Sequence, residues 1–154
     1  MNNRHLKLAA VLCALFCIGR VIQQGWFLVF APAPDPTIAS FAGCYRVTST
    51  IETGIIVAIG IGASLLLYTR QTPSRGLGVG AFCLFMIWRS YVANLGMFFS
   101  PMFGDGSLYD AATGWWHLHG PHIWIYSLYL SLLLIASILA LGGSYVLRNR
   151  NPVA

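Results

Sequence analysis

The chain has 154 residues, of which 57% are apolar and only 8% are charged, with a formal net charge of +5. An ordinary soluble domain carries roughly 25% charged residues, so this composition disfavours a water-soluble globule and excludes disordered, collagen-like and disulfide-rich secreted classes. The mean hydropathy of +0.70 indicates an all-α, polytopic membrane protein. We expect the protein to lie in the lipid bilayer and to bind no nucleic acid.

Four apolar segments are long enough to cross a hydrocarbon core of ~30 Å, which takes roughly 20 helical residues. They cover about residues 8–30, 49–68, 77–99 and 121–147. The turn between the second and third segments is short, so these two helices are predicted to be antiparallel neighbours. We predict one four-transmembrane-helix bundle over residues 1–154, with 31–48 and 100–120 as loops.

Basic residues gather on one side of this arrangement. Six of the nine Lys and Arg residues lie where the predicted spans begin or end on that side: Arg4, Lys7, Arg70, Arg75, Arg148 and Arg150. By the positive-inside rule, both termini are cytoplasmic and the two long loops lie outside. The expected location is therefore a membrane, most simply a bacterial inner membrane, crossed several times.

Two arginines lie at membrane depth. Arg20 follows Lys7, and Arg89 follows Arg75, by nearly the same length of chain. At 1.5 Å per residue, both start about 20 Å from the inner boundary. Such an arginine costs at least about 2.5–3.5 kcal/mol. Glu52, expected about one turn into the second span, is the only acid within a span, and one carboxylate cannot neutralise two guanidiniums.

A strip of neutral polar residues continues from these charges towards the outer face and consists of Gln23, Gln24 and Asn94. Three interpretations compete. The strip is a structural network that locks helix packing, a site for a quinone headgroup, a lipid phosphate or a small anion, or a place where a carboxylate of another subunit pairs with an arginine. The sequence leaves all three open.

Small residues recur every four positions in the second span, at Gly54, Ala58 and Gly62. This spacing lets two helix backbones approach closely in lipid. We predict that the face is buried against another helix, either within this chain, in a second copy or in another membrane subunit. The glycines of the third and fourth spans predict flexible or closely packed ends: Gly76, Gly78, Gly80, Gly142 and Gly143.

Three histidines, His117, His119 and His122, lie near the predicted outer interface, and Asp110 precedes them. Imidazole and carboxylate are ligands for copper and zinc, so this cluster is a candidate metal site. The spacing matches no closed zinc signature. An interfacial belt of Trp and His is the competing interpretation.

Cys13 and Cys17 are four positions apart and so share a helix face, and Cys83 lies at a depth where it faces them. Buried apolar thiols are the expected state, with a soft-metal relay as the alternative. Cys44 stands alone in the predicted outer loop, which does not fit a disulfide oxidase with its exposed cysteine pairs.

No nucleotide-binding or hydrolase motif is present, so the sequence gives no catalytic residues and leans away from an enzyme. Short loops, intramembrane arginines and a small-residue face favour a non-catalytic subunit of a larger membrane complex. Its polar, cationic site would pair with a partner or bind a quinone, lipid or anion. The alternatives are an outer-face copper- or zinc-binding redox protein and a small oligomeric anion transporter.

Overall fold

The computed structural model of the chain describes residues 4–30, 39–99 and 123–150. Apart from the turn at residues 70–72, this part is helical, as the sequence predicts, and it contains no strand. Its four helices are α1 (Arg4–Phe30), α2 (Ala39–Thr69), α3 (Pro73–Phe99) and α5 (Ile123–Arg150). A short turn joins α2 to α3.

Three of the described helices are long and apolar enough to cross a membrane. The qualifying stretches are Arg4–Trp26 in α1, Val47–Thr69 in α2 and Leu128–Asn149 in α5. These are the properties expected of a multi-pass membrane protein. The crossing by α3, which has 27 residues, stays a prediction, as does the side of the membrane on which each terminus lies.

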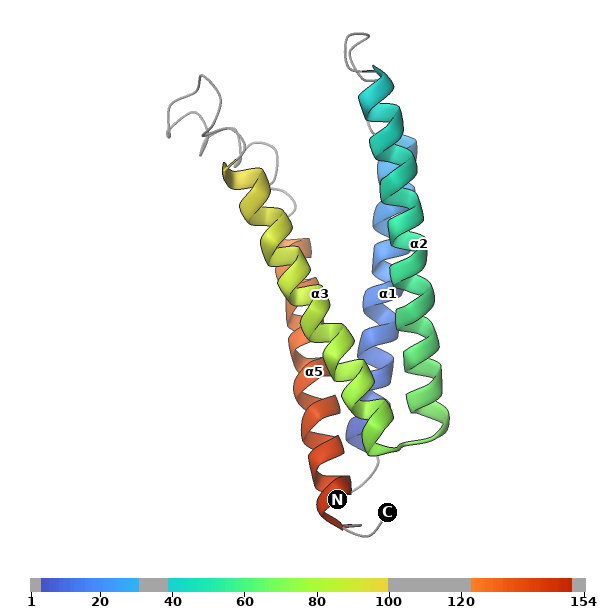
Figure 1. Ribbon diagram of the computed structural model, residues 1–154, viewed down its shortest axis with the longest axis vertical. Helices are drawn as coiled ribbons and strands as arrows, with labels where there is room; N and C mark the ends of the chain where they lie inside the picture. Colours follow the sequence, from blue (N-terminus) through green and yellow to red (C-terminus); the bar gives the residue numbers. More distant parts are fainter. Residues whose placement is uncertain (1–3, 31–38, 100–122, 151–154) are drawn as a thin grey trace.

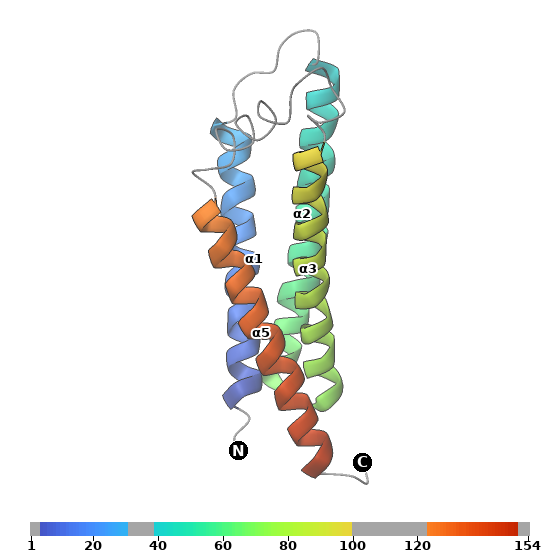
Figure 2. The same cartoon turned by 90° about the vertical axis from the view of Figure 1, so that its left-hand side faces the viewer.

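The helices form two pairs, α1 with α2 and α3 with α5 (Figure 1). The pairs converge where α1 begins, α5 ends and the α2–α3 turn lies, and they separate towards the other end. Figure 2 shows α5 inclined, so that it packs on both α1 and α3. We call the convergent end, which carries Arg4, Arg70 and Arg148, the terminal end.

Buried positions recur with heptad spacing in each helix. The repeats are Leu6–Cys13 and Ala10–Cys17 in α1, Thr53–Gly60–Leu67 in α2, Gly76–Cys83 in α3 and Leu133–Ala140 in α5. A heptad repeat is the signature of left-handed knobs-into-holes packing. Many of these residues are small, and close approach of helices in lipid depends on small side chains.

Glycines make the closest of these contacts. A Cβ atom on Gly60 would run into Cys17 Sγ and would lie 2.8 Å from Phe82 Cζ. A Cβ on Gly76 would run into Ser144 Oγ and would lie 3.1 Å from the Ala140 carbonyl oxygen. The sequence predicts that the span-end glycines are either closely packed or flexible. Close packing holds for Gly76, Gly80 and Gly143, whereas a Cβ on Gly78 or Gly142 would meet nothing within 4 Å.

The predicted small-residue face of α2 is not buried within the chain. Ala58 is exposed, and a Cβ on Gly54 or Gly62 would meet nothing within 4 Å. The reason is rotational: Ala58 and Gly60 are two positions apart, which is about 200° around a helix. Because Gly60 packs inward, the Gly54–Ala58–Gly62 face points outward, and no helix among residues 4–30, 39–99 and 123–150 covers it.

The helix that carries the second span begins earlier than the predicted boundary at residue 49. Its apolar stretch does begin close to that boundary, at Val47, but α2 itself begins at Ala39. Cys44 therefore lies in a helix and not in a loop, so the predicted loop over 31–48 is wrong in its second half. No proline occurs between Pro36 and Pro73, so nothing in this stretch breaks the helical hydrogen bonds where the apolar residues end.

Gly60→Ala and Gly76→Ala should each destabilise the protein, because the added methyl group has no space. We expect a loss of about 1–3 kcal/mol for overpacking of this kind, measured as a lower midpoint of thermal unfolding in detergent. Gly78→Ala and Gly142→Ala are the matched controls, because a Cβ at either position meets nothing within 4 Å, and they should not lower the midpoint. Equal effects at all four positions would contradict the packing described above.

Candidate functional site

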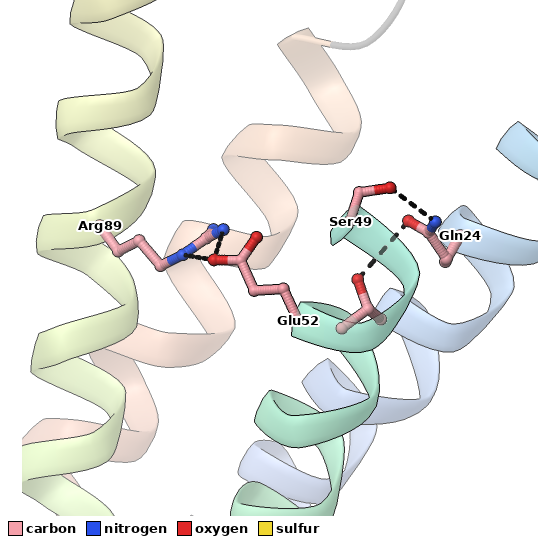
Figure 3. Close-up of polar contacts among 5 residues, drawn as sticks. Gln24, Ser49, Glu52 and Arg89 are labelled. Atoms are coloured by element: carbon pink, nitrogen blue, oxygen red, sulfur yellow. Dashed lines mark hydrogen bonds and ion pairs between the residues drawn. The ribbon is translucent and has the colours of Figure 1, made fainter. Parts of the chain in front are cut away.

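Three ionisable side chains lie at one level of the bundle. Arg20, Arg89 and Glu52 are nearly equally far along α1, α3 and α2, respectively, when each helix is followed from the terminal end. At 1.5 Å per residue, each is about 24–26 Å from that end. Followed from the terminal end, this level lies just beyond Cys17, the last residue of α1 that the structure describes as buried. Arg89 and Glu52 lie here on separate ribbons, with their side chains meeting between them (Figure 3).

Arg89 and Glu52 form an ion pair between α3 and α2. Arg89 Nε donates a hydrogen bond of 2.9 Å to Glu52 Oε1, and Nη2 contacts the same oxygen (Figure 3). The Glu52 side chain is 50% exposed and that of Arg89 is 28% exposed. The pair therefore joins the two helix pairs across their separation while staying accessible from outside the chain.

Gln24 joins α1 to α2 through its amide group. Its Nε2 donates to Ser49 Oγ at 3.1 Å (Figure 3) and to Thr50 Oγ1 at 3.0 Å, and the Thr53 hydroxyl donates to Oε1 at 3.5 Å. Neutral hydrogen bonds between membrane helices are modest in energy but orient the helices. These contacts fit the first of the three interpretations, a structural network between helices.

Arg20 is satisfied only in part. Its Nη1 donates to Gln23 Oε1 at 2.7 Å, one turn along the same helix. Its Nε is buried and has no hydrogen-bond partner within the described residues. Glu52 is the only acid in this part of the chain, and Arg89 engages it. The described residues thus offer one carboxylate to two arginines. Arg89 binds it, and Arg20 does not.

Tyr129 anchors α5 beside Arg20. Its hydroxyl donates to the Gly19 carbonyl at 2.9 Å, and its ring meets the Phe16 ring edge-on, with centroids 5.9 Å apart. A Cβ on Gly19 would lie 2.7 Å from the tyrosine ring. This contact holds the α1 backbone next to Arg20 in a fixed position.

Sequence reasoning missed Tyr129 and the hydroxyl partners of Gln24. The spacing of Ser49, Thr50 and Thr53, one turn apart near Glu52, was a usable signal for a polar helix face. No such signal existed for Tyr129, because its partner is a backbone carbonyl and glycine carries no side chain to mark it.

Several candidate residues lie outside the described part of the chain: His117, His119, His122, Asp110 and the side chain of Asn94. Within the described residues, no group of three or more His, Cys, Asp or Glu side chains is arranged to hold a metal ion. The proposed copper or zinc site at the histidines stays a prediction.

The three membrane cysteines do meet, as their positions predict. Cys13, Cys17 and Cys83 are free thiols and fully buried. All three belong to one buried core cluster, and Cys13 Sγ lies 4.0 Å from the Gly60 carbonyl oxygen. All three cysteines lie in the described part, in which no metal-binding arrangement is found, so the soft-metal alternative has no support and buried apolar thiols fit the packing.

Comparison of the chain with protein families, with curated proteins and with solved structures finds no match. The function is therefore argued from the site alone.

The Arg89–Glu52 pair predicts energetic coupling between α2 and α3. Glu52→Gln and Arg89→Gln should each destabilise the protein, because each leaves a charge without its partner. The double variant should lose about 1 kcal/mol less unfolding free energy than the two single variants lose together. Thermal unfolding in detergent measures these losses. Glu52→Gln combined with Arg70→Gln, at the terminal end, is the control and should be additive. Additivity in the first pair would mean that the ion pair is absent in solution.

Proposed function

We propose that this chain is a non-catalytic subunit of a larger complex in a bacterial inner membrane, with four spans and both termini in the cytoplasm. The site formed by Arg20, Arg89 and Glu52 receives an acceptor group from outside the chain. That acceptor is a carboxylate of a partner subunit or an oxygen of a quinone, lipid or small anion. The observation that carries this proposal is the incomplete satisfaction of Arg20.

The energetic argument starts from the cost of a guanidinium in lipid. An arginine at the centre of a membrane helix costs at least about 2.5–3.5 kcal/mol, and such residues normally pair with one another or line a functional path. Arg89 meets this cost by binding Glu52. Arg20 has one neutral partner, Gln23, and a buried Nε without an acceptor among the described residues. A further acceptor would remove most of that cost.

The chemistry of the guanidinium narrows the acceptor. Arginine presents a planar fork of N–H donors that matches carboxylate, phosphate and carbonyl oxygens. An acceptor that approaches Arg20 also finds Glu52 half-exposed. The described residues at this level carry one guanidinium more than carboxylates. A carboxylate of a partner subunit would neutralise that charge, whereas a quinone carbonyl would only accept a hydrogen bond.

The outward face of α2 supports the assembly part of the proposal. Gly54, Ala58 and Gly62 present a shallow surface that no described helix of this chain covers. Small residues at this spacing suit close contact with another transmembrane helix. We assign this face to another subunit or a second copy of the chain, at a contact separate from the arginines.

Purification in a mild detergent tests the role of Arg20. The wild-type protein should co-purify with another membrane subunit or carry a non-protein molecule, both detected by native mass spectrometry. Arg20→Gln should reduce that species by at least about tenfold, because a hydrogen bond to a charged group contributes about 1.5–3 kcal/mol.

Arg70→Gln is the matched control, since it removes the same charge at the terminal end, far from the site. It should leave unchanged the species that Arg20→Gln removes, even where phospholipid bound at the terminal end is lost. A wild-type protein that runs as a bare monomer, with nothing bound, would contradict the proposal. So would an Arg20→Gln variant that retains the full amount of its partner or ligand.

A further inference from the structure

The terminal end of the bundle carries a dense set of cations. Basic side chains lie there on α1, α3, α5 and the α2–α3 turn, namely Arg4, Lys7, Arg70, Arg75 and Arg148. The only described acid, Glu52, is about 25 Å away at the 1.5 Å rise of a helix. Within the described residues, no carboxylate neutralises this end.

Two of these cations are held in place by neutral partners. Lys7 Nζ lies 5.5 Å from the centre of the Tyr68 ring, and Arg75 Nη1 donates to the Leu66 carbonyl at 2.8 Å. Both contacts bring a charge from a neighbouring helix to the last turn of α2. A ring and a carbonyl orient a cation without cancelling its charge, so the positive potential of this end is preserved.

Apolar side chains flank the cations. Leu65 and Leu66 of α2, Leu8 of α1 and Leu77 of α3 are all about half exposed. Tyr68 and Tyr145 are exposed as well, and tyrosine is typical of the membrane–water interface. A ligand with both a negative headgroup and an apolar chain would therefore contact cations and exposed leucines together.

We propose that the terminal end binds the phosphate headgroups of anionic phospholipids. The basic side chains take the phosphate, and the exposed leucines contact the acyl chains. Free phosphate shares the headgroup chemistry but gains nothing from the leucines. This site is separate from the Arg20–Arg89–Glu52 site and does not depend on the function proposed for it.

Native mass spectrometry tests the assignment with the full chain in mixed micelles of phosphatidylglycerol and phosphatidylcholine. The wild-type protein should retain phosphatidylglycerol preferentially. The triple variant Arg4→Gln/Arg70→Gln/Arg148→Gln leaves the contacts of Lys7 and Arg75 intact. Its preference should fall by about fivefold for each removed charge, the equivalent of about 1 kcal/mol per basic residue near an anionic surface. If the triple variant does not fold, each single variant should show its own fivefold loss.

Two comparisons separate the possible sources of the signal. Arg20→Gln/Arg89→Gln removes the charges of the other site, so any lipid held there is lost while the preference due to the terminal end should remain. Complete loss of the preference in this variant would place the lipid at that site and overturn the assignment. Inorganic phosphate at the same concentration should not displace phosphatidylglycerol, and displacement would mean a free-phosphate site. A wild-type protein without lipid preference, or basic-end variants that retain it, would also overturn the proposal.

Discussion

Helices in lipid receive no hydrophobic push towards one another, so they approach closely only where the side chains between them are small. In this protein, that condition is met at the terminal end. The side chains of Cys17 and Phe82 pack against the backbone of Gly60, and those of Ser144 and Leu6 pack against Gly76. These contacts bring the two helix pairs together at one end, and the level at which they separate follows from where the small residues stop.

The polar site lies at this separation. Beyond the last core cysteine of α1, Arg20 and Gln24 replace small apolar residues, and Glu52 and Arg89 lie at the same level on α2 and α3. The ion pair joins α3 to α2 at this level, and the Tyr129–Phe16 ring contact joins α5 to α1 beside it. A charge at this depth needs an oxygen partner, so the change from small to polar residues along α1 creates the demand for an acceptor.

Much of the architecture is predictable from the sequence because it follows from length and composition. Four apolar segments and a short turn predict four helices with α2 and α3 antiparallel, and the equal spacing of Arg20 and Arg89 from basic residues predicts their common level. The common depth of Cys83 with Cys13 and Cys17 follows from the same arithmetic. These features depend only on helical rise and on the lipid environment.

Other features depend on rotation and on partners, which a single sequence does not specify. Gly54, Ala58 and Gly62 satisfy the small-residue pattern, but so do Gly60 and Ser64, and only tertiary packing decides which set faces inward. Likewise, Glu52 lay within reach of either arginine by level alone, and Arg89 is the one that binds it. The start of α2 differs from the predicted boundary because the helix outlasts its apolar stretch, and helix propensity does not end with hydropathy.

The central claim is that Arg20 has an acceptor supplied from outside the chain. The most direct measurement is an experimental density map of the protein extracted in its native lipid, at a resolution that shows side chains. We expect density that does not belong to this chain, either a partner carboxylate or a bound ligand oxygen, within hydrogen-bonding distance of the Arg20 guanidinium. A guanidinium that turns to share Glu52 with Arg89, with no other density beside it, would contradict the claim.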